Sequence, residues 1–129
     1  MEVRVERRKH KRFSARDGSI AALKKNNINS KCGIITDISR GGLAFRYLAY
    51  IHDHDKVPEE QFEVDILYEV NHFFLLNMPC IIVQDNYIPP EYSFSLGLMR
   101  KCRIRFGTLA SYQIPPLEYF LTHCTHCTV

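Results

Sequence analysis

The sequence predicts a mainly β domain, a small antiparallel barrel or sandwich, followed by a C-terminal helix. Three observations indicate this. Apolar residues alternate with polar ones in several short runs, which is the pattern of half-buried strands. Turn-forming residues separate these runs at close spacing. The chain has 129 residues, 46% of them hydrophobic, which suits one domain with one core.

Three runs alternate with a period of two residues and predict strands. Their apolar faces are, in chain order, Ile34, Thr36 and Ile38; Phe62, Val64, Ile66 and Tyr68; and Cys102, Ile104 and Phe106. A fourth run, residues 73–83, is almost continuously apolar except at Asn77 and Pro79. Because proline has no N–H to offer a neighbouring strand, we expect an edge strand or a bulge there.

Only the C-terminal end has a helical pattern. Pro115-Pro116 suits the first turn of a helix, where the missing N–H costs nothing. Glu118 would then complement the positive end of the helix dipole. One face of this helix carries Leu117, Phe120 and Leu121. We therefore expect a helical segment over residues 109–124 that packs on one end of the sheet.

The net charge of +3 is modest, but it is unevenly distributed. Seven of the 17 basic residues lie between Arg4 and Arg16. Such a cluster is typical of a solvated tail, a phosphate site or a membrane-surface patch. No apolar run has the length of a membrane span or the place of a signal-peptide core, so we expect a cytoplasmic protein. Cys32, Cys80 and Cys102 lie in apolar segments, and we expect them to be reduced core thiols.

Arg7, Arg8 and Arg12 are the basic residues with the most specific chemistry. The planar guanidinium grips a phosphate bidentately and also bonds the O6 and N7 edge of guanine. One residue type can therefore recognise both parts of a guanine nucleotide. From composition alone, a solvated basic tail is an equally good interpretation, and a nucleic-acid contact is a weaker one.

The second cluster is the turn over residues 37–42, which joins two predicted strands. Asp37 and Ser39 can bond neighbouring backbone groups, and Asp37 can also accept from the N1 and N2 donors of guanine. Ser39 can donate to a phosphate. Gly41 and Gly42 let a ligand approach the main chain. Taken alone, these residues are also those of an ordinary hairpin turn.

Together the two segments resemble the PilZ family. Residues 8–12 read Arg8-Lys-His-Lys-Arg12, the family's Arg-x-x-x-Arg motif, and a further arginine precedes them. Residues 37–42 read Asp-Ile-Ser-Arg-Gly-Gly, which is the Asp/Asn-x-Ser-x-x-Gly motif. The order of the motifs and the distance between them also match, and the resemblance covers most of the chain.

The resemblance implies a six-stranded antiparallel barrel with a trailing helix and cyclic di-GMP as the ligand. Residues 1–16 would be a flexible basic arm and residues 17–107 the barrel. Arg8 and Arg12 would contact phosphate and guanine, Asp37 a guanine edge, and Ser39, Gly41 and Gly42 the ligand from the turn. Arg7 matches a position associated with binding of a stacked pair of ligand molecules.

The charge distribution suggests how such a receptor would signal. The like charges of the unliganded arm favour mobility, and a dianionic ligand would neutralise the arm and hold it on the barrel. An effector protein, unidentified by the sequence, would sense the changed surface. The main alternative is a small barrel that binds nucleic acid through its basic arm. We expect no enzyme, because no nucleophile stands with a base in a recognisable motif.

A cluster of His and Cys residues ends the chain, at residues 123–127. Cys124 and Cys127 have the Cys-x-x-Cys spacing of a zinc site, but a second ligand pair is missing from the sequence. We therefore expect no metal, and interpret the segment as a frayed tail or a last helical turn. Residues 52–55, which alternate His and Asp, are interpreted as a solvated loop.

Overall fold

The computed structural model describes residues 10–49, 61–89 and 99–128, with the backbone alone for residues 127 and 128. Its strands are β1 (Phe13–Ala15), β2 (Ser19–Lys25), β3 (Ile28–Ile38), β4 (Gly42–Leu48), β5 (Phe62–Tyr68), β6 (Phe73–Tyr87), β7 (Met99–Phe106) and β8 (Thr125–Thr128). The helix α1 spans Ile114–His123, and two single 3-10 turns span Glu69–Asn71 and Ser111–Gln113.

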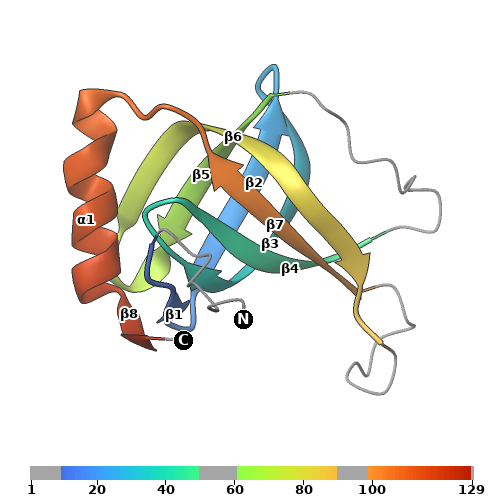
Figure 1. Cartoon of the computed structure of the whole chain (residues 1–129), viewed down its shortest axis with the longest axis horizontal. Helices are drawn as coiled ribbons and strands as arrows, with labels where there is room; N and C mark the ends of the chain where they lie inside the picture. Colours follow the sequence, from blue (N-terminus) through green and yellow to red (C-terminus); the bar gives the residue numbers. More distant parts are fainter. Residues whose placement is uncertain (1–9, 50–60, 90–98, 129) are drawn as a thin grey trace, which may run out of the picture.

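Six of these strands close into an antiparallel barrel (Figure 1). The order is β2-β5-β6-β7-β4-β3, and β3 pairs back onto β2. Two further strands extend the sheet outside the barrel, because β1 pairs with β3 and β8 with β1. The predicted fold class, a six-stranded antiparallel barrel with a C-terminal helix, is confirmed in the described part of the chain.

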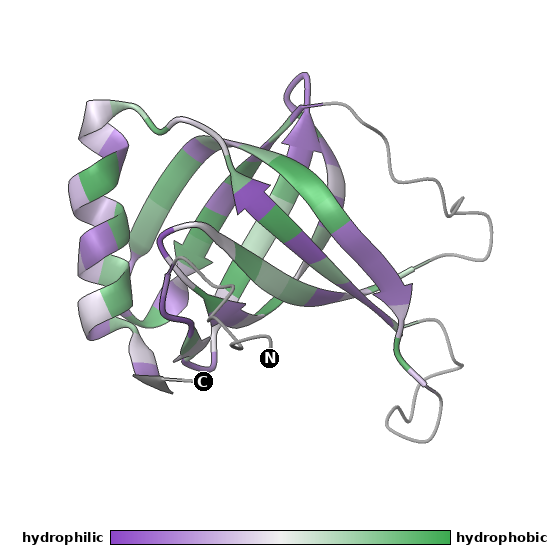
Figure 2. Ribbon diagram, in the orientation of Figure 1, coloured by the Kyte–Doolittle hydropathy of each residue, from purple (hydrophilic) through white to green (hydrophobic). Residues whose placement is uncertain are grey.

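The inward faces of the strands fill the barrel with apolar side chains, and Figure 2 shows the alternation along β7. The alternation predicted for residues 62–68 and 102–106 is confirmed, since each apolar member is buried. The largest fully buried side chains include Leu23, Ile38, Leu43, Phe45, Ile66, Met78 and Ile104. This core is continuous with the apolar face of α1.

The phase predicted for residues 34–38 is wrong at Ile34 and confirmed at Ile38. Ile34 is 53% exposed, whereas its neighbour Ile35 is buried. Ile35 pairs with Phe45 and Asp37 with Ala44, so Thr36 is an extra residue in β3. This bulge reverses the facing of the strand, which explains why Ile38 is buried although Ile34 is not.

A second irregularity lies in β6 near Pro79. The strand pairs with both β5 and β7, so it is not an edge strand. The register shifts where Ile66 pairs with Leu75 and Val64 with Met78, and Asn77 has a left-handed φ of 61°. The bulge, rather than the edge strand, is thus the correct alternative for this segment.

Two of the three predicted core thiols are confirmed. Cys80 and Cys102 are buried, and burial raises the pKa of each thiol to about 12. The prediction for Cys32 is wrong, because this residue is exposed. It shares the outward face of β3 with Ile34, two residues further on. On this face, apolar side chains are exposed to solvent.

Helix α1 covers one side of the barrel (Figure 1). It begins at Ile114 with prolines in its first turn, as expected. Phe120 packs edge-on against Tyr68 and also contacts Phe73. Glu118 lies beyond the first turn, so its expected interaction with the helix N-terminus is wrong. In the described ranges, no helix is long and apolar enough to cross a membrane.

The chain does not fray after α1. Thr125–Thr128 forms β8, and Ala15 of β1 lies opposite Thr125. The Thr125 hydroxyl donates to the carbonyl of Leu121, and the Arg16 guanidinium donates to the carbonyl of Thr125. The interpretation as a frayed tail or a last helical turn is therefore corrected, because β1 supplies a strand partner that local sequence does not reveal.

A cluster of polar side chains connects the strands β4, β6 and β7. The Asp85 carboxylate accepts hydrogen bonds from the Tyr47 hydroxyl (2.7 Å) and from Nε of Arg100 (2.8 Å). Arg100 is 3% exposed and also lies over the ring of Tyr87. Burial, and then the bond to Asp85, raise the pKa of Tyr47. Asp85 therefore compensates a buried guanidinium.

Two glycines permit close approach between strands. A Cβ at Gly42 would lie 2.1 Å from the carbonyl oxygen of Ile104, and one at Gly33 would lie 1.9 Å from that of Arg46. Real Cβ atoms do not come so near to backbone oxygens. Gly42 is thus required by the β4–β7 pairing, independently of any ligand.

Replacing Asp85 by alanine should destabilise the fold by about 3–5 kcal/mol, because it removes the carboxylate that binds the buried Arg100 guanidinium and the Tyr47 hydroxyl. Urea unfolding followed by circular dichroism measures the change. Glu118→Ala removes a carboxylate from an exposed ion pair and serves as the control, with an expected loss of about 1 kcal/mol or less. Equal losses for the two variants would contradict this account.

Gly42→Ala should cost about 3 kcal/mol or more, because the methyl group overlaps the backbone of β7. Gly107→Ala is the matched control, since a Cβ there meets Pro79 at an ordinary 3.5 Å. We expect that variant to unfold within about 1 kcal/mol of the wild type. Thermal unfolding of both proteins compares them directly, and an intact Gly42→Ala protein would refute the close approach.

Candidate functional site

Strand β1 places the basic start of the chain beside the turn at residues 37–42. In the β1–β3 pairing, Phe13 lies opposite Ile38 and Ser14 opposite Asp37. Arg12 directly precedes β1 and is therefore beside the turn. The other two predicted arginines, Arg7 and Arg8, lie outside the described residues. One end of the arginine motif and the turn are thus neighbours in space.

Ser39 holds the turn in shape. Its N–H donates to the carbonyl of Gly42 (2.8 Å), and its Oγ accepts from the N–H of Gly41 (3.0 Å). The carbonyl of Gly41 accepts from the N–H of Phe106 on β7 (2.8 Å). A Cβ at Gly41 would lie 2.8 Å from Cδ2 of His10, so the basic segment also contacts the turn here. A side chain at Gly41 would displace His10.

The bulge at Thr36 directs Asp37 to the outer face of the barrel. Ile35 points into the core, and two residues later an unbulged strand would point Asp37 inward as well. The extra residue instead pairs Asp37 with Ala44. The Thr36 hydroxyl donates to the carbonyl of Ala44 (3.2 Å) and stabilises the irregular segment. The carboxylate consequently lies among outward-facing side chains of β4 and β7.

Arg103 of β7 binds Asp37 through both of its terminal nitrogens. Nη1 donates to Oδ1 at 3.2 Å and Nη2 to Oδ2 at 3.1 Å. This parallel fork fixes the plane of the carboxylate. A carboxylate has about four lone-pair positions, so roughly two stay available to another donor. Asp37 is thus both oriented and still able to accept hydrogen bonds.

Arg40, at the tip of the turn, connects the site to the C-terminal helix. Its guanidinium pairs with Glu118 of α1, with Nη2 to Oε2 at 2.9 Å and Nε to Oε1 at 2.6 Å. Both side chains are substantially exposed, so the pair adds little to stability. It nevertheless gives the turn a direct contact with a different element of the fold.

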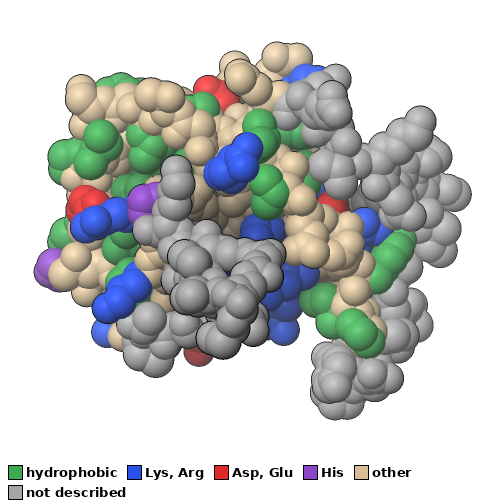
Figure 3. Space-filling model, viewed as in Figure 1, with side chains coloured by type: hydrophobic (Ala, Val, Ile, Leu, Met, Phe, Trp, Pro, Cys, Tyr) green, Lys and Arg blue, Asp and Glu red, His purple; other side chains and the backbone are tan. Residues whose placement is uncertain are grey.

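The outer face of β4 and β7 is strongly basic. Lys101, Arg103 and Arg105 share the outward side of β7, and Arg46 lies on β4 opposite Lys101. Lys and Arg side chains gather near the middle of the face in Figure 3, where β4 and β7 come forward in Figure 1. This face lies next to the turn, because Gly42 pairs with Arg105.

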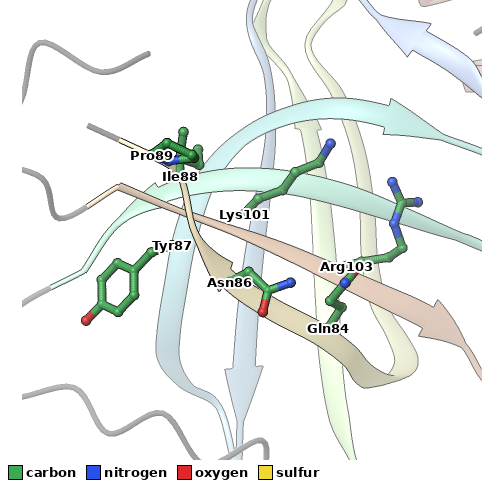
Figure 4. A pocket seen from close by; sticks show the side chains of 7 residues that line it. All are labelled: Gln84, Asn86, Tyr87, Ile88, Pro89, Lys101 and Arg103. Carbon is green, nitrogen blue, oxygen red and sulfur yellow. The ribbon is translucent and has the colours of Figure 1, made fainter. Parts of the chain in front are cut away.

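A pocket of about 260 Å³ opens on the same face, over β6, β7 and the residues that follow β6. Its lining residues are Gln84, Asn86, Tyr87, Ile88, Pro89, Lys101 and Arg103. Figure 4 shows Lys101 and Arg103 extending from the same side of β7. Arg103 therefore belongs both to this pocket and to the Asp37 pair, and it links the turn to the pocket.

Sequence reasoning identified the turn but missed the strand residues that complete its surroundings. In the sequence, Arg103 and Arg105 are only the polar residues between Cys102, Ile104 and Phe106 of a predicted strand. Three cations in a row at a spacing of two, starting from Lys101, were the available signal, since they must share one face. Their distance from the turn was not readable, because it depends on the β4–β7 pairing.

The His/Cys cluster has a different environment from the one expected. Cys124 is fully buried and lies near Nδ2 of Asn71 (4.0 Å), and burial raises the pKa of its thiol. Only the backbone of Cys127 is described, in β8. Across the described residues, no group of three or more His, Cys, Asp or Glu side chains is arranged to hold a metal ion. Residues 52–55, predicted to be a solvated loop, lie outside the described residues.

The chain has no match among family models or curated proteins, but it resembles several solved structures, including the following three. The MrkH–c-di-GMP complex of K. pneumoniae superimposes with a TM-score of 0.67 at 15% identity. The PilZ domain of YcgR from Escherichia coli, solved with c-di-GMP, gives 0.67 at 12% identity. MotI/DgrA, the Bacillus subtilis inhibitor of motility, gives 0.63 at 16% identity.

These similarities differ in how much of each protein they involve. The match covers 92% of this chain and 92% of the YcgR domain. It covers 92–93% of this chain but only 52% of the MrkH and MotI chains, so this chain spans about half their length. A barrel with the same strand arrangement is therefore shared at low sequence identity, and the chain has the fold of a PilZ domain.

Proposed function

We propose that this protein is a cytoplasmic receptor for cyclic di-GMP that acts by binding and not by catalysis. The observation that carries the proposal is the β1–β3 pairing. It brings the end of the Arg-x-x-x-Arg motif at Arg12 beside the turn that carries Asp37 and Ser39. Two of the structural neighbours are described as bound to c-di-GMP, which supports the same ligand here.

Each predicted site residue has a role that follows from its chemistry. Arg8 and Arg12 grip the phosphates and the O6/N7 edge of guanine with their planar forks. Asp37 accepts from the N1 and N2 donors of the base, through the lone pairs that Arg103 leaves available. Ser39 keeps the turn in shape, Gly41 keeps the backbone of the turn open to the ligand and the arm, and Gly42 lets the turn lie close against β7. Arg7 is assigned to a second, stacked ligand molecule.

Signalling follows from neutralisation of the arm. The ligand carries two negative charges, and the arm over residues 1–16 carries a concentrated positive charge. Binding lowers the repulsion within the arm and holds it against the barrel. The Arg40–Glu118 pair gives the turn a route to α1, so an effector protein that contacts the helix would sense the bound state.

Nucleic-acid binding is the second candidate, and the basic face of β4 and β7 favours it. The two functions differ in their response to salt. Binding of a long polyanion weakens steeply with salt, because many counterions are released. Binding of one dianionic dinucleotide releases few. Titrations with a single-stranded oligonucleotide at several salt concentrations separate the two, and tight, steeply salt-dependent oligonucleotide binding without dinucleotide binding would favour this candidate.

Isothermal titration with cyclic di-GMP tests the proposal. The wild-type protein should show saturable binding, and Arg8→Ala and Arg12→Ala should each weaken it about tenfold to a hundredfold, the effect of losing hydrogen bonds to a charged group. Lys11→Ala removes the same charge from the same segment at an exposed, variable position of the motif, so it is the matched control. We expect that variant to bind nearly as the wild type does.

The outcome that would overturn the proposal is specific. An absence of heat and of competition at high micromolar ligand would exclude a cyclic di-GMP receptor. Equal losses for Arg12→Ala and Lys11→Ala would show that total charge, and not the motif, determines binding.

A further inference from the structure

Two cations face each other directly across the outer side of the β4–β7 pair. Arg46 lies opposite Lys101, and both residues are exposed. Opposed side chains of an antiparallel pair share one face with Cβ atoms roughly 5 Å apart, and like charges there destabilise the sheet. Within residues 10–49, 61–89 and 99–128, no carboxylate forms an ion pair with either of them.

Among the described residues, this arrangement of like charges is unfavourable for the sheet. The neighbouring cation Arg103 differs, because Asp37 compensates it. The strand partner of Lys101 on the other side is Asn86 of β6, which is neutral. The pair of Arg46 and Lys101 is therefore an uncompensated positive centre among the described residues, and an anion bound between the two side chains would remove their repulsion.

The pocket over β6 and β7 adjoins this centre. Lys101 lines it together with the amide side chains of Gln84 and Asn86. Its volume of about 260 Å³ is below the several hundred Å³ of a site for a whole drug-sized ligand. It suits a fragment, such as one nucleobase next to a phosphate. Amide groups can bond the edge of a base, and the cations can bond the phosphate.

We propose that Arg46, Lys101 and this pocket form an additional subsite for a nucleotide phosphate and its base. Arg103 connects it to the turn, because the same guanidinium binds Asp37 and lines the pocket. The assignment of the subsite to one half of cyclic di-GMP rests on the proposed function. The presence of an anion subsite on β4 and β7 does not.

The first experiment is titration of cyclic di-GMP into the full chain at several salt concentrations. Lys101→Gln and Arg46→Gln should each weaken binding about tenfold or more, because each removes a charged partner of the phosphate. Each should also reduce the salt slope of log K by about one, as expected for a lost phosphate contact. Lys25→Gln, an equal change of charge on β2, should alter neither quantity.

Stability provides an internal check on these variants. Neutralising either Arg46 or Lys101 relieves their repulsion, so the midpoint of thermal unfolding should stay the same or rise. A loss of binding with an unchanged or raised midpoint therefore reports a lost contact and not a damaged fold. Wild-type dinucleotide affinity in both Lys101→Gln and Arg46→Gln would overturn the assignment to cyclic di-GMP.

A second probe, inorganic pyrophosphate, keeps the two proposals distinguishable. If the wild type binds no cyclic di-GMP, the proposed function fails, and pyrophosphate then tests the subsite alone. Binding of pyrophosphate that Lys101→Gln and Arg46→Gln remove, and that Lys25→Gln leaves intact, supports the subsite. No binding of either anion to the wild type would overturn it.

Discussion

The candidate site depends on one irregularity in a strand, the extra residue Thr36 in β3. Side chains of a regular strand alternate, so without the bulge Asp37 would share the inward direction of Ile35 and bury a carboxylate in the core. With the bulge, Asp37 faces outward and meets Arg103 in a two-pronged ion pair. The same shift returns Ile38 to the core immediately before the turn, which anchors the turn on its inner side.

Another bulge lies on the opposite side of the site, in β6, and is distinct from the one near Pro79. In β6, Ile82 pairs with Ile104 and Gln84 with Arg103, which leaves Val83 as the extra residue. The two bulges flank the regular β4–β7 pair at the same level of the barrel, with Asp37 on one side and Gln84 on the other. The outer face between them combines a fixed carboxylate, amide groups and several cations. Such a surface is costly for the isolated protein and favourable in the presence of a dianion.

The sequence predicted the barrel well because period-two alternation reports burial directly, as in residues 62–68. It failed for residues 34–38, since a bulge leaves no mark on local composition. The two motifs were visible as separate segments, but the contact between them depends on β1, three residues long and held by a strand from the chain's other end. The sequence did not point to Arg46, Lys101 and Arg103 for the same reason. These residues come close to the turn only through strand pairing over a long sequence separation.

The central claim is that the basic segment and the turn form one site that responds to one ligand. Hydrogen exchange with and without cyclic di-GMP tests it most directly. The account predicts that the ligand slows exchange together in residues 10–16 and 37–44, while residues 20–25 and 62–68, in strands outside the site, exchange as before. Slowing in only one of the first two segments, or in neither, would contradict it.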